Sequence, residues 1–269
     1  MTGCGGAATR ANSPAPTVSS VPDRVEPLTP APAPALPVTV TSADGTEVTV
    51  TSAERVIPLT GSLNEIVQTL GLGNRVVARD ITATFEQATK LPVVTRGHDV
   101  SAESVLSLRP TLVLAETTSG PAEAIRQIRD AGIPLLVITP AKSLDDVPKR
   151  IETVAGALGV RDAGARLKQR TAERIAAARK DIPGDTSGKK PRVAFLYLRG
   201  SASVYLLGGS DSGAASLLEA AGAVDTGKES GLGKDFTPPS PARPWRPPRP
   251  TRSSSCPRAW SPWAASTAW

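Results

Sequence analysis

Histidine is nearly absent from this chain of 269 residues, since His98 is the only one. A single imidazole excludes metal sites built from several histidines and leaves any imidazole chemistry to one residue. Cysteine is almost as scarce, and the compositions around Cys4 and Cys256 are too unstructured to predict a disulfide between them. The sequence also has no apolar run long enough to span a bilayer.

Acidic residues are missing from one segment. The net charge is +6, but residues 239–269 contain no Asp or Glu and hold five arginines, at 243, 246, 249, 252 and 258. The rest of the chain is therefore close to neutral. A basic nucleic-acid-binding module would rest wholly on these arginines, so the sequence predicts no nucleic-acid partner.

The N-terminal residues 1–37 are poor in aliphatic side chains and rich in Pro, Ala, Ser and Thr, a composition typical of an extended, unpacked tether. Small residues before Cys4, with Gly5 and Gly6 after it, resemble the end of a lipoprotein signal whose charged and apolar parts are missing. We interpret the start codon as mis-set. We expect a mature protein that is lipid-anchored through Cys4 on the outer face of the cell membrane.

Residues 38–143 alternate between strand and helix patterns. VTVTSADGTEVTVTS, from Val38, predicts a hairpin around Asp44-Gly45. The later segments give strands at RVIPL, RVVARD, LPVV, TLVLAE and IPLLVIT, with helices at SLNEIVQTLGLG, SAESVLSL and GPAEAIRQIRDAG. Strands separated by helical crossovers predict an α/β lobe with parallel strands.

Two helices follow, at residues 144–158 and 161–182, and the second is long enough to extend roughly 30 Å. Residues 144–189 are therefore expected to bridge two lobes. RVAFLYLRG then predicts a strand and DSGAASLLEAAGAVD a helix, so residues 190–238 are expected to begin a second α/β lobe.

With this order of elements, the chain resembles the helical-bridge substrate-binding proteins of ABC importers for siderophores, cobalamin and haem. The resemblance covers residues 38–238 and is carried by SLNEIVQTLGLGNRVVARD, GHDVSAESVLSLRPTLVLAE, AIRQIRDAGIPLLVI and SGAASLLEAAGAVD. It implies a two-lobed α/β periplasmic-binding-protein fold with a long bridging helix. It also implies an ABC permease and its ATPase as partners, with Glu103 docking on an arginine pocket of the permease.

The ligand depends on two segments at the carboxyl ends of predicted strands, where α/β lobes bind ligands. One contains His98 and the other Tyr197 and Arg199. They match the positions at which haem-binding lipoproteins of actinobacterial importers clamp haem iron between a histidine and a tyrosine, so the resemblance implies His98 and Tyr197 as axial ligands. Both side chains bind ferric iron. Arg199, on the same strand face as Tyr197, would favour the phenolate as a supporting partner.

Other interpretations remain. Tyr205 is a weaker ligand candidate, better explained as a buried strand aromatic. Cobalamin-binding or siderophore-binding relatives would not need a His/Tyr pair, so another metal chelate is the alternative ligand. An anion-binding enzyme domain could use GGSDSGAAS at a helix N-terminus. The sequence has no P-loop, no GxGxxG and no nucleophile elbow, so catalysis is not expected.

Leu, Ile and Val are absent after Leu232, while all four tryptophans lie at 245 and beyond. Such a segment cannot form the strands that the second lobe still needs. If each codon of residues 239–269 began at its present third base, the translated segment would show a helix pattern followed by a strand pattern. Positions 253–256 would then be four consecutive aliphatic residues, provided that their serine codons are TCN. We therefore interpret residues 239–269 as out of frame and the second lobe as incomplete. The docking glutamate of the second lobe would then be missing from this chain. We expect the chain as given to retain haem weakly or not at all. Nucleotide sequencing across codons 236–240 tests this, and an early stop codon in the hidden frame would refute it.

Overall fold

The computed structural model describes residues 23–96, 99–182, 190–199, 204–231 and 235–236. The chain divides into two compact units, with the boundary between Asp181 and Ile182. This division agrees with the two-lobed fold predicted from the sequence. The units are described separately below.

The first unit opens with the predicted hairpin. Strands β1 (Val38–Thr41) and β2 (Glu47–Val50) pair antiparallel, and Gly45 in the connecting turn has φ +84°. Glycine reaches this left-handed region without steric cost. Burial opposes ionisation of the Asp44 carboxyl in the turn, but hydrogen bonds from Arg129, Ser42 and Thr46 outweigh it and lower its pKa. The turn is thereby fixed against the rest of the unit.

Two three-stranded sheets form the centre of the unit. One has the order β3-β7-β8, with all strands parallel, and the other has the order β4-β5-β6, with β6 antiparallel to β5. A hydrogen bond of 3.1 Å from Val77 N to Val56 O joins the two sheets. Their strands are β3 (Val56–Pro58), β4 (Arg79–Asp80), β5 (Val93–Arg96), β6 (Asp99–Val100), β7 (Leu112–Glu116) and β8 (Leu135–Ile138).

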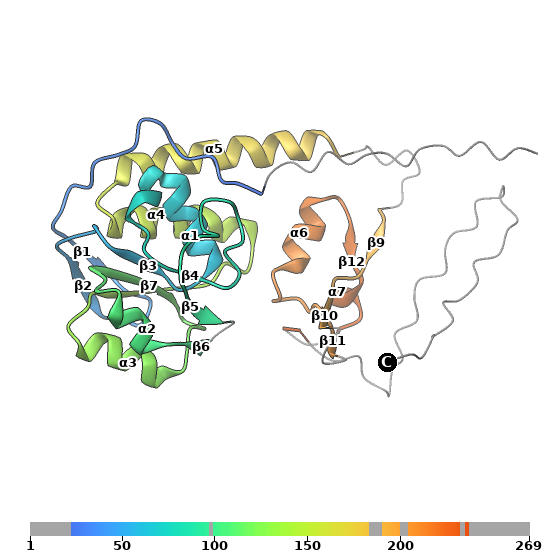
Figure 1. Ribbon diagram of the computed structural model, residues 1–269. Coiled ribbons are helices and arrows are strands. Elements are labelled where there is room, and N and C mark those ends of the chain that lie inside the picture. Colours follow the sequence, from blue (N-terminus) through green and yellow to red (C-terminus); the bar gives the residue numbers. More distant parts are fainter. Residues whose placement is uncertain (1–22, 97–98, 183–189, 200–203, 232–234, 237–269) are drawn as a thin grey trace, which may run out of the picture. The chain divides into compact units, whose positions relative to one another are not determined.

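Helices cover both faces of the β3-β7-β8 sheet (Figure 1). They are α1 (Gly61–Val67), α2 (Ala102–Ser107), α3 (Ala122–Asp130) and α4 (Val147–Ala157). Successive strand residues point to opposite faces, so Leu114 packs with α1 and α4 while Val113 packs with α2 and α3. Both faces of the sheet are therefore buried, as parallel strands require.

The predicted helix at residues 62–73 ends as its glycines suggested, but the strand expected at 75–80 is mostly wrong. After α1 come a π-helical turn (Gln68–Leu72) and a 3-10 turn (Gly73–Arg75), and Gly71 has φ +90°. Val76 N donates a hydrogen bond to the carbonyl of Gly73. Val76 therefore forms only an isolated bridge with Val56 instead of extending a strand. Regular pairing is restricted to β4.

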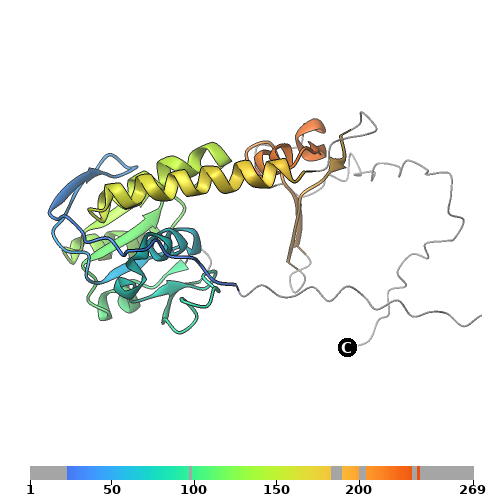
Figure 2. The ribbon, with the colours of Figure 1, turned by 90° about the horizontal axis from the view of Figure 1, so that it is seen from above.

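The long helix predicted at residues 161–182 is present as α5 (Arg161–Lys180), 20 residues long, and it belongs to the first unit. It packs beside α4 in both views (Figure 2). A Cβ on Gly164 would lie 2.5 Å from the Ala155 methyl, so glycine permits this close approach. A short 3-10 helix (Leu144–Asp146), closed by a capping box between Ser143 and Asp146, precedes α4. None of the helices in the described ranges has the length and apolarity needed to cross a membrane.

Residues 23–37 correct the expectation of an unpacked tether that ends at Val38. Val25 is 8% exposed and packs with Phe85 and Ala88. Leu28 N donates to Thr69 O at 2.8 Å, and Ala35 N donates to Gly159 O at 2.9 Å. Composition misled here because these few apolar side chains and backbone groups find partners that lie far along the chain. The packed part of the first unit therefore includes residues 23–37.

Packing of this segment has a consequence for a carboxyl on α1. Partial burial and the nearby Asp23 carboxylate raise the pKa of Glu65. The protonated Glu65 therefore contributes most to stability at a pH below its pKa in the unfolded chain, about 4.3. This contribution is lost as pH rises through the pKa of Glu65 in the folded chain. We expect Asp23→Asn to lower the Glu65 pKa toward its ordinary value, as measured by NMR titration. An unchanged Glu65 pKa would mean that Asp23 does not lie beside α1.

The described part of the second unit contains two two-stranded sheets. β9 (Arg192–Val193) is parallel to β12 (Val224–Asp225), and β10 (Leu196–Arg199) is antiparallel to β11 (Val204–Leu207). The single strand predicted at 192–200 is thus two strands, because the second half turns to pair with β11. Helices α6 (Ala214–Ala220) and α7 (Thr226–Glu229) complete the described part.

Candidate functional site

Strands β5 and β6, which come before and after His98 in the sequence, form one end of the β4-β5-β6 sheet. Thr95 pairs with Val100 and Arg96 with Asp99 in the antiparallel β5-β6 ladder. Gly97 and His98 lie outside the described residues, so His98 is placed only by its described neighbours. Thr95 is buried, whereas Arg96 and Asp99 are exposed. The described residues before and after these two, Arg96 and Asp99, therefore form an exposed pair at the edge of the sheet.

The turn after β7 touches this edge. Val100 N donates to Gly120 O at 2.7 Å, and Asp99 forms an isolated parallel bridge with Gly120. Within the turn, Glu116 N donates to Ser119 Oγ at 3.0 Å and Ser119 N donates to Glu116 O at 2.9 Å. The carboxyl end of β7 is thereby connected to β6 through backbone groups.

A nearly buried ion pair lies at the same end of β7. Arg150 Nη2 donates to Glu116 Oε1 at 2.6 Å, and the two side chains are 7% and 11% exposed. The hydroxyls of Thr60 and Ser62 donate to the same carboxylate oxygen, and Arg150 Nη1 donates to Thr139 O at 2.6 Å. This network joins the ends of β3, β7 and β8 to α4.

The sequence interpretation missed this network, although one signal for it was present. Arg150 lies four residues before Val154 and seven before Ala157, on the apolar face of an amphipathic helix. A cation at such a position requires a buried partner, and Glu116 ends the otherwise apolar strand LVLAE. Pairing the two would have been a reasonable prediction.

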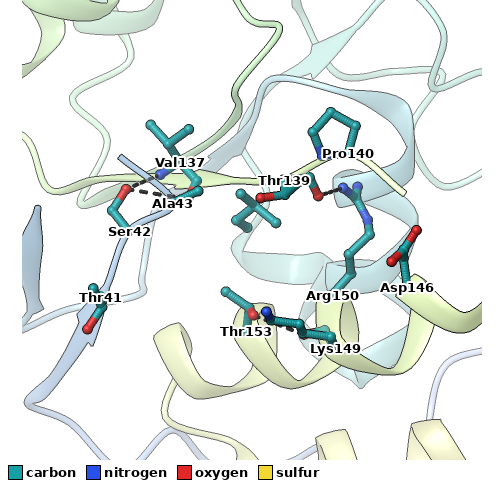
Figure 3. A pocket seen from close by; sticks show the side chains of 11 residues that line it. Thr41, Ser42, Ala43, Val137, Thr139, Pro140, Asp146, Lys149, Arg150 and Thr153 are labelled. Atoms are coloured by element: carbon teal, nitrogen blue, oxygen red, sulfur yellow. Dashed lines mark hydrogen bonds between the residues drawn. The ribbon is translucent and has the colours of Figure 1, made fainter. Parts of the chain in front are cut away.

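A polar pocket of about 330 Å³ lies between the end of β1, the end of β8 and α4 (Figure 3). Ser42 Oγ accepts from Val137 N at 2.9 Å, and Arg150 reaches the carbonyl of Thr139 in the same view. The pocket is at the small end of the range for ligand sites. None of the residues predicted to bind ligand lines it. Its lining is Thr41, Ser42, Ala43, Val137, Ile138, Thr139, Pro140, Asp146, Lys149, Arg150 and Thr153.

Glu103 is accessible on the surface of the first unit. It is exposed in the first turn of α2, whose N-cap Ser101 accepts from Ser104 N at 3.2 Å. Within the described ranges Glu103 takes part in no ion pair. An unpaired carboxylate at a helix start is free to meet a cationic partner.

Tyr197 lies in the second unit, on β10, where it pairs with Leu206. Its side chain is 46% exposed, and its ring centre is 5.9 Å from that of Phe236. Phe195, Leu196 and Leu198 are also exposed. Arg199 ends the same strand. The phenol and the neighbouring apolar side chains of β10 are therefore accessible to solvent.

Two further predicted features are the lipid anchor at Cys4 and the anion-binding segment GGSDSGAAS. Cys4 lies outside the described residues, so the lipid anchor stays a prediction. In the GGSDSGAAS segment, Ser212 Oγ donates to Gly209 O at 2.8 Å, so the loop closes on itself before α6. No group of three or more His, Cys, Asp or Glu residues able to hold a metal occurs in the part of the chain that the structure describes.

Solved structures similar to this chain include haem-binding proteins. The heme binding protein HmuT has a TM-score of 0.75 and 33% identity, over 80% of this chain and 70% of its own. The periplasmic heme-binding protein RhuT from Roseiflexus sp. RS-1 has a TM-score of 0.65 and 37% identity, over 71% of this chain and 72% of its own. Both likenesses span the two-lobed fold.

Curated relatives match a shorter stretch. The ABC transporter substrate-binding lipoprotein YvrC of Bacillus subtilis (strain 168) is 38% identical over 106 residues, which is 39% of this chain and 34% of YvrC. A vitamin B12-binding protein of Pectobacterium carotovorum is 29% identical over 101 residues, 37% of this chain and 36% of that protein. This chain thus matches about a third of the length of these relatives.

The family described as periplasmic binding protein matches residues 56–244. This range begins at β3 and covers parts of both units. The compared proteins are binding proteins rather than enzymes, in agreement with the absence of catalytic motifs from the sequence. The chain therefore belongs to the periplasmic binding protein family.

Proposed function

We propose that this protein captures ferric haem outside the cytoplasm and delivers it to the permease of an ABC importer. One observation carries the choice of haem. Solved variants of HmuT replace a histidine, a tyrosine and an arginine by alanine, and these residues are separated by the same intervals along their chain as His98, Tyr197 and Arg199 are here. Equal spacing in a haem-binding protein of 33% identity supports assigning His98, Tyr197 and Arg199 to the ligand site.

The proposed mechanism uses one iron ligand from each unit. His98 follows β5 in the first unit, and Tyr197 is on β10 of the second. Imidazole nitrogen and phenolate oxygen both bind ferric iron, and a nearby guanidinium favours the phenolate. Closure of the two units around haem would bring both ligands to the metal. Arg199 is proposed as the group that supports Tyr197.

Cobalamin is the second candidate ligand, because vitamin B12-binding proteins are among the relatives. Separate calorimetric titrations with hemin, cyanocobalamin and a ferric siderophore distinguish the candidates, using a chain whose residues 239–269 follow the alternative reading frame. The proposal predicts that hemin gives heat of binding and that cyanocobalamin and the siderophore give none. Binding of cyanocobalamin without hemin would contradict it and make cobalamin the ligand.

We also propose that Glu103 docks on the permease and that Cys4 anchors the protein to the membrane. Glu103→Arg is expected to weaken binding to the detergent-solubilised cognate permease by about 10-fold or more, because like charges would meet at the pocket. Hemin affinity should not change.

Glu123→Arg is the matched control for docking, since Glu123 occupies the first turn of α3 as Glu103 does that of α2. It should leave permease binding near the unsubstituted value. Equal losses in the two variants would show a general effect of charge and would remove Glu103 from the docking site.

A further inference from the structure

We propose that residues 23–37 form a strap that lies on a surface shaped for its backbone and holds the exposed half of α5, residues 168–180, in place. This role goes beyond the proposed function, because it concerns the first unit alone and does not depend on which ligand is bound. The second unit begins at Ile182, directly after α5. The strap would therefore fix the helix that leads into the second unit.

Two glycines allow the strap backbone to lie directly on the first unit. Leu28 N donates to Thr69 O at 2.8 Å, and a Cβ on Gly71 would lie 2.9 Å from Leu28 O. Ala35 N donates to Gly159 O at 2.9 Å, and a Cβ on Gly159 would lie 2.5 Å from Ala35 O. A side chain at either glycine would displace the strap, so both positions are shaped for close approach of a backbone.

Contacts with the first unit are spread along the whole strap. Val25 is buried, and its N–H and C=O bond to the side-chain amide of Gln87 at 3.2 and 2.8 Å. Leu28 and Leu36 pack against the core. Exposure alternates from one residue to the next over 31–37, as in an extended segment with one face on a surface. The strap is therefore held at both ends and between them.

Prolines lower the cost of holding the strap in one conformation. They occupy positions 27, 30, 32, 34 and 37. Proline has a fixed φ, so an extended segment rich in proline loses little conformational freedom when it is held. The two backbone donors, Leu28 and Ala35, lie between prolines and keep their N–H groups. The composition that is typical of a tether thus also suits a strap.

The strap reaches the exposed half of α5. The buried residues of this helix all lie at or before Leu167, so residues 168–180 have no buried side chain to hold them. Arg170 Nη2 donates to Glu26 O at 2.8 Å, and Arg174 forms an ion pair with the Glu26 carboxylate. Glu26 thereby contacts two successive turns of the helix. An exposed ion pair is weak by itself, so the hold on α5 depends on the fixed backbone of the strap.

Amide hydrogen exchange in the full chain tests the strap. Gly159→Ala is expected to speed exchange at Leu28 N–H and Ala35 N–H by about 5- to 10-fold, because the added methyl releases the strap as one segment. Amides of residues 172–180 should exchange about 2- to 3-fold faster as the helix loses its support. Equal exchange of residues 172–180 in Gly159→Ala and in the control described next would show that the strap does not hold α5.

Gly132→Ala is the matched control for backbone strain. Gly132 follows α3 as Gly159 follows α4, and the two have φ of +77° and +68°. A Cβ on Gly132 would meet nothing within 4 Å, whereas one on Gly159 meets the strap. Gly132→Ala should therefore leave the strap and α5 amides near the unsubstituted rates. Rapid, unprotected exchange of Leu28 and Ala35 in the unsubstituted chain would overturn the strap itself.

Glu26→Gln tests the link to α5 without a change inside the packed unit, since Glu26 is exposed. Exchange over residues 172–180 should rise about 2-fold, while Ala35 N–H stays slow. Glu173→Gln is the matched control, because the Glu173 carboxylate accepts from Gln169 within α5. It should change exchange over residues 172–180 less than Glu26→Gln does. Equal rates in the two variants would remove Glu26 from the contact that holds the helix.

Discussion

Replacing Tyr197 by phenylalanine is expected to weaken ferric haem binding by about 100-fold or more and to shift the Soret band. The substitution keeps the ring that contacts Phe236 and removes only the oxygen that would bind iron. Loss of a group that merely supports a metal ligand already costs about 10- to 100-fold, so loss of the ligand should cost at least as much. Absorbance titration with hemin measures both effects in a chain whose residues 239–269 follow the alternative reading frame.

His98→Ala should produce a loss of similar size with a different spectrum, since the remaining ligand is then oxygen rather than nitrogen. Tyr205→Phe is the matched control, because Tyr205 is the only other tyrosine of the chain and lies on the adjacent strand β11. It should bind hemin as the unsubstituted chain does. If Tyr205→Phe alters the spectrum and Tyr197→Phe does not, the two tyrosines have been assigned the wrong way round.

Replacing Arg150 by methionine is expected to destabilise the first unit by about 3–5 kcal/mol, because it leaves the Glu116 carboxylate buried without its cation. For a unit of this size the melting temperature should fall by roughly 6–20 °C. Calorimetry measures the change. The double substitution Glu116→Met with Arg150→Met should recover most of the loss, since replacing both charges by apolar groups of similar volume is often nearly neutral.

Arg126→Met provides the comparison for an exposed pair. Arg126 and Glu123 form an ion pair on α3 with side chains 63% and 54% exposed. Its loss should cost less than about 1 kcal/mol, because water already screens the two charges. If Arg150→Met is no more destabilising than Arg126→Met, the Glu116–Arg150 pair does not hold the strand ends together.

Much of the first unit follows from its sequence. The Asp44-Gly45 hairpin, most of the alternating strands and helices and the long helix α5 lie where the patterns predict them, because strands buried on both faces appear as continuous apolar runs and helices as apolar residues at helical spacing. The segments that failed depend on distant partners. Val76 bonds to Gly73 instead of extending a strand, and residues 23–37 bind groups near residues 69, 87 and 159. Local composition does not contain such contacts.

In the candidate site too, features set by local sequence were predictable and those set by distant contacts were not. Glu103 is exposed at a helix start, as a docking role requires, because its helix follows from a local capping pattern. The link from Ser119 through Gly120 to Val100 was not predictable, since it depends on backbone groups whose identity the sequence does not specify. His98, Cys4 and residues 239–269 lie outside the described residues, so the histidine ligand, the anchor and the out-of-frame tail stay predictions. The family match reaches residue 244, six residues beyond Pro238.

Hemin titration followed in the Soret region tests the central claim most directly. It should use this chain beside a second chain in which residues 239–269 follow the alternative reading frame. The second chain is predicted to give a saturable band at one haem per chain that depends on both His98 and Tyr197, with weaker or absent retention by the first. A second chain that shows no saturable band, or one that His98→Ala and Tyr197→Ala both leave unchanged, would contradict the account.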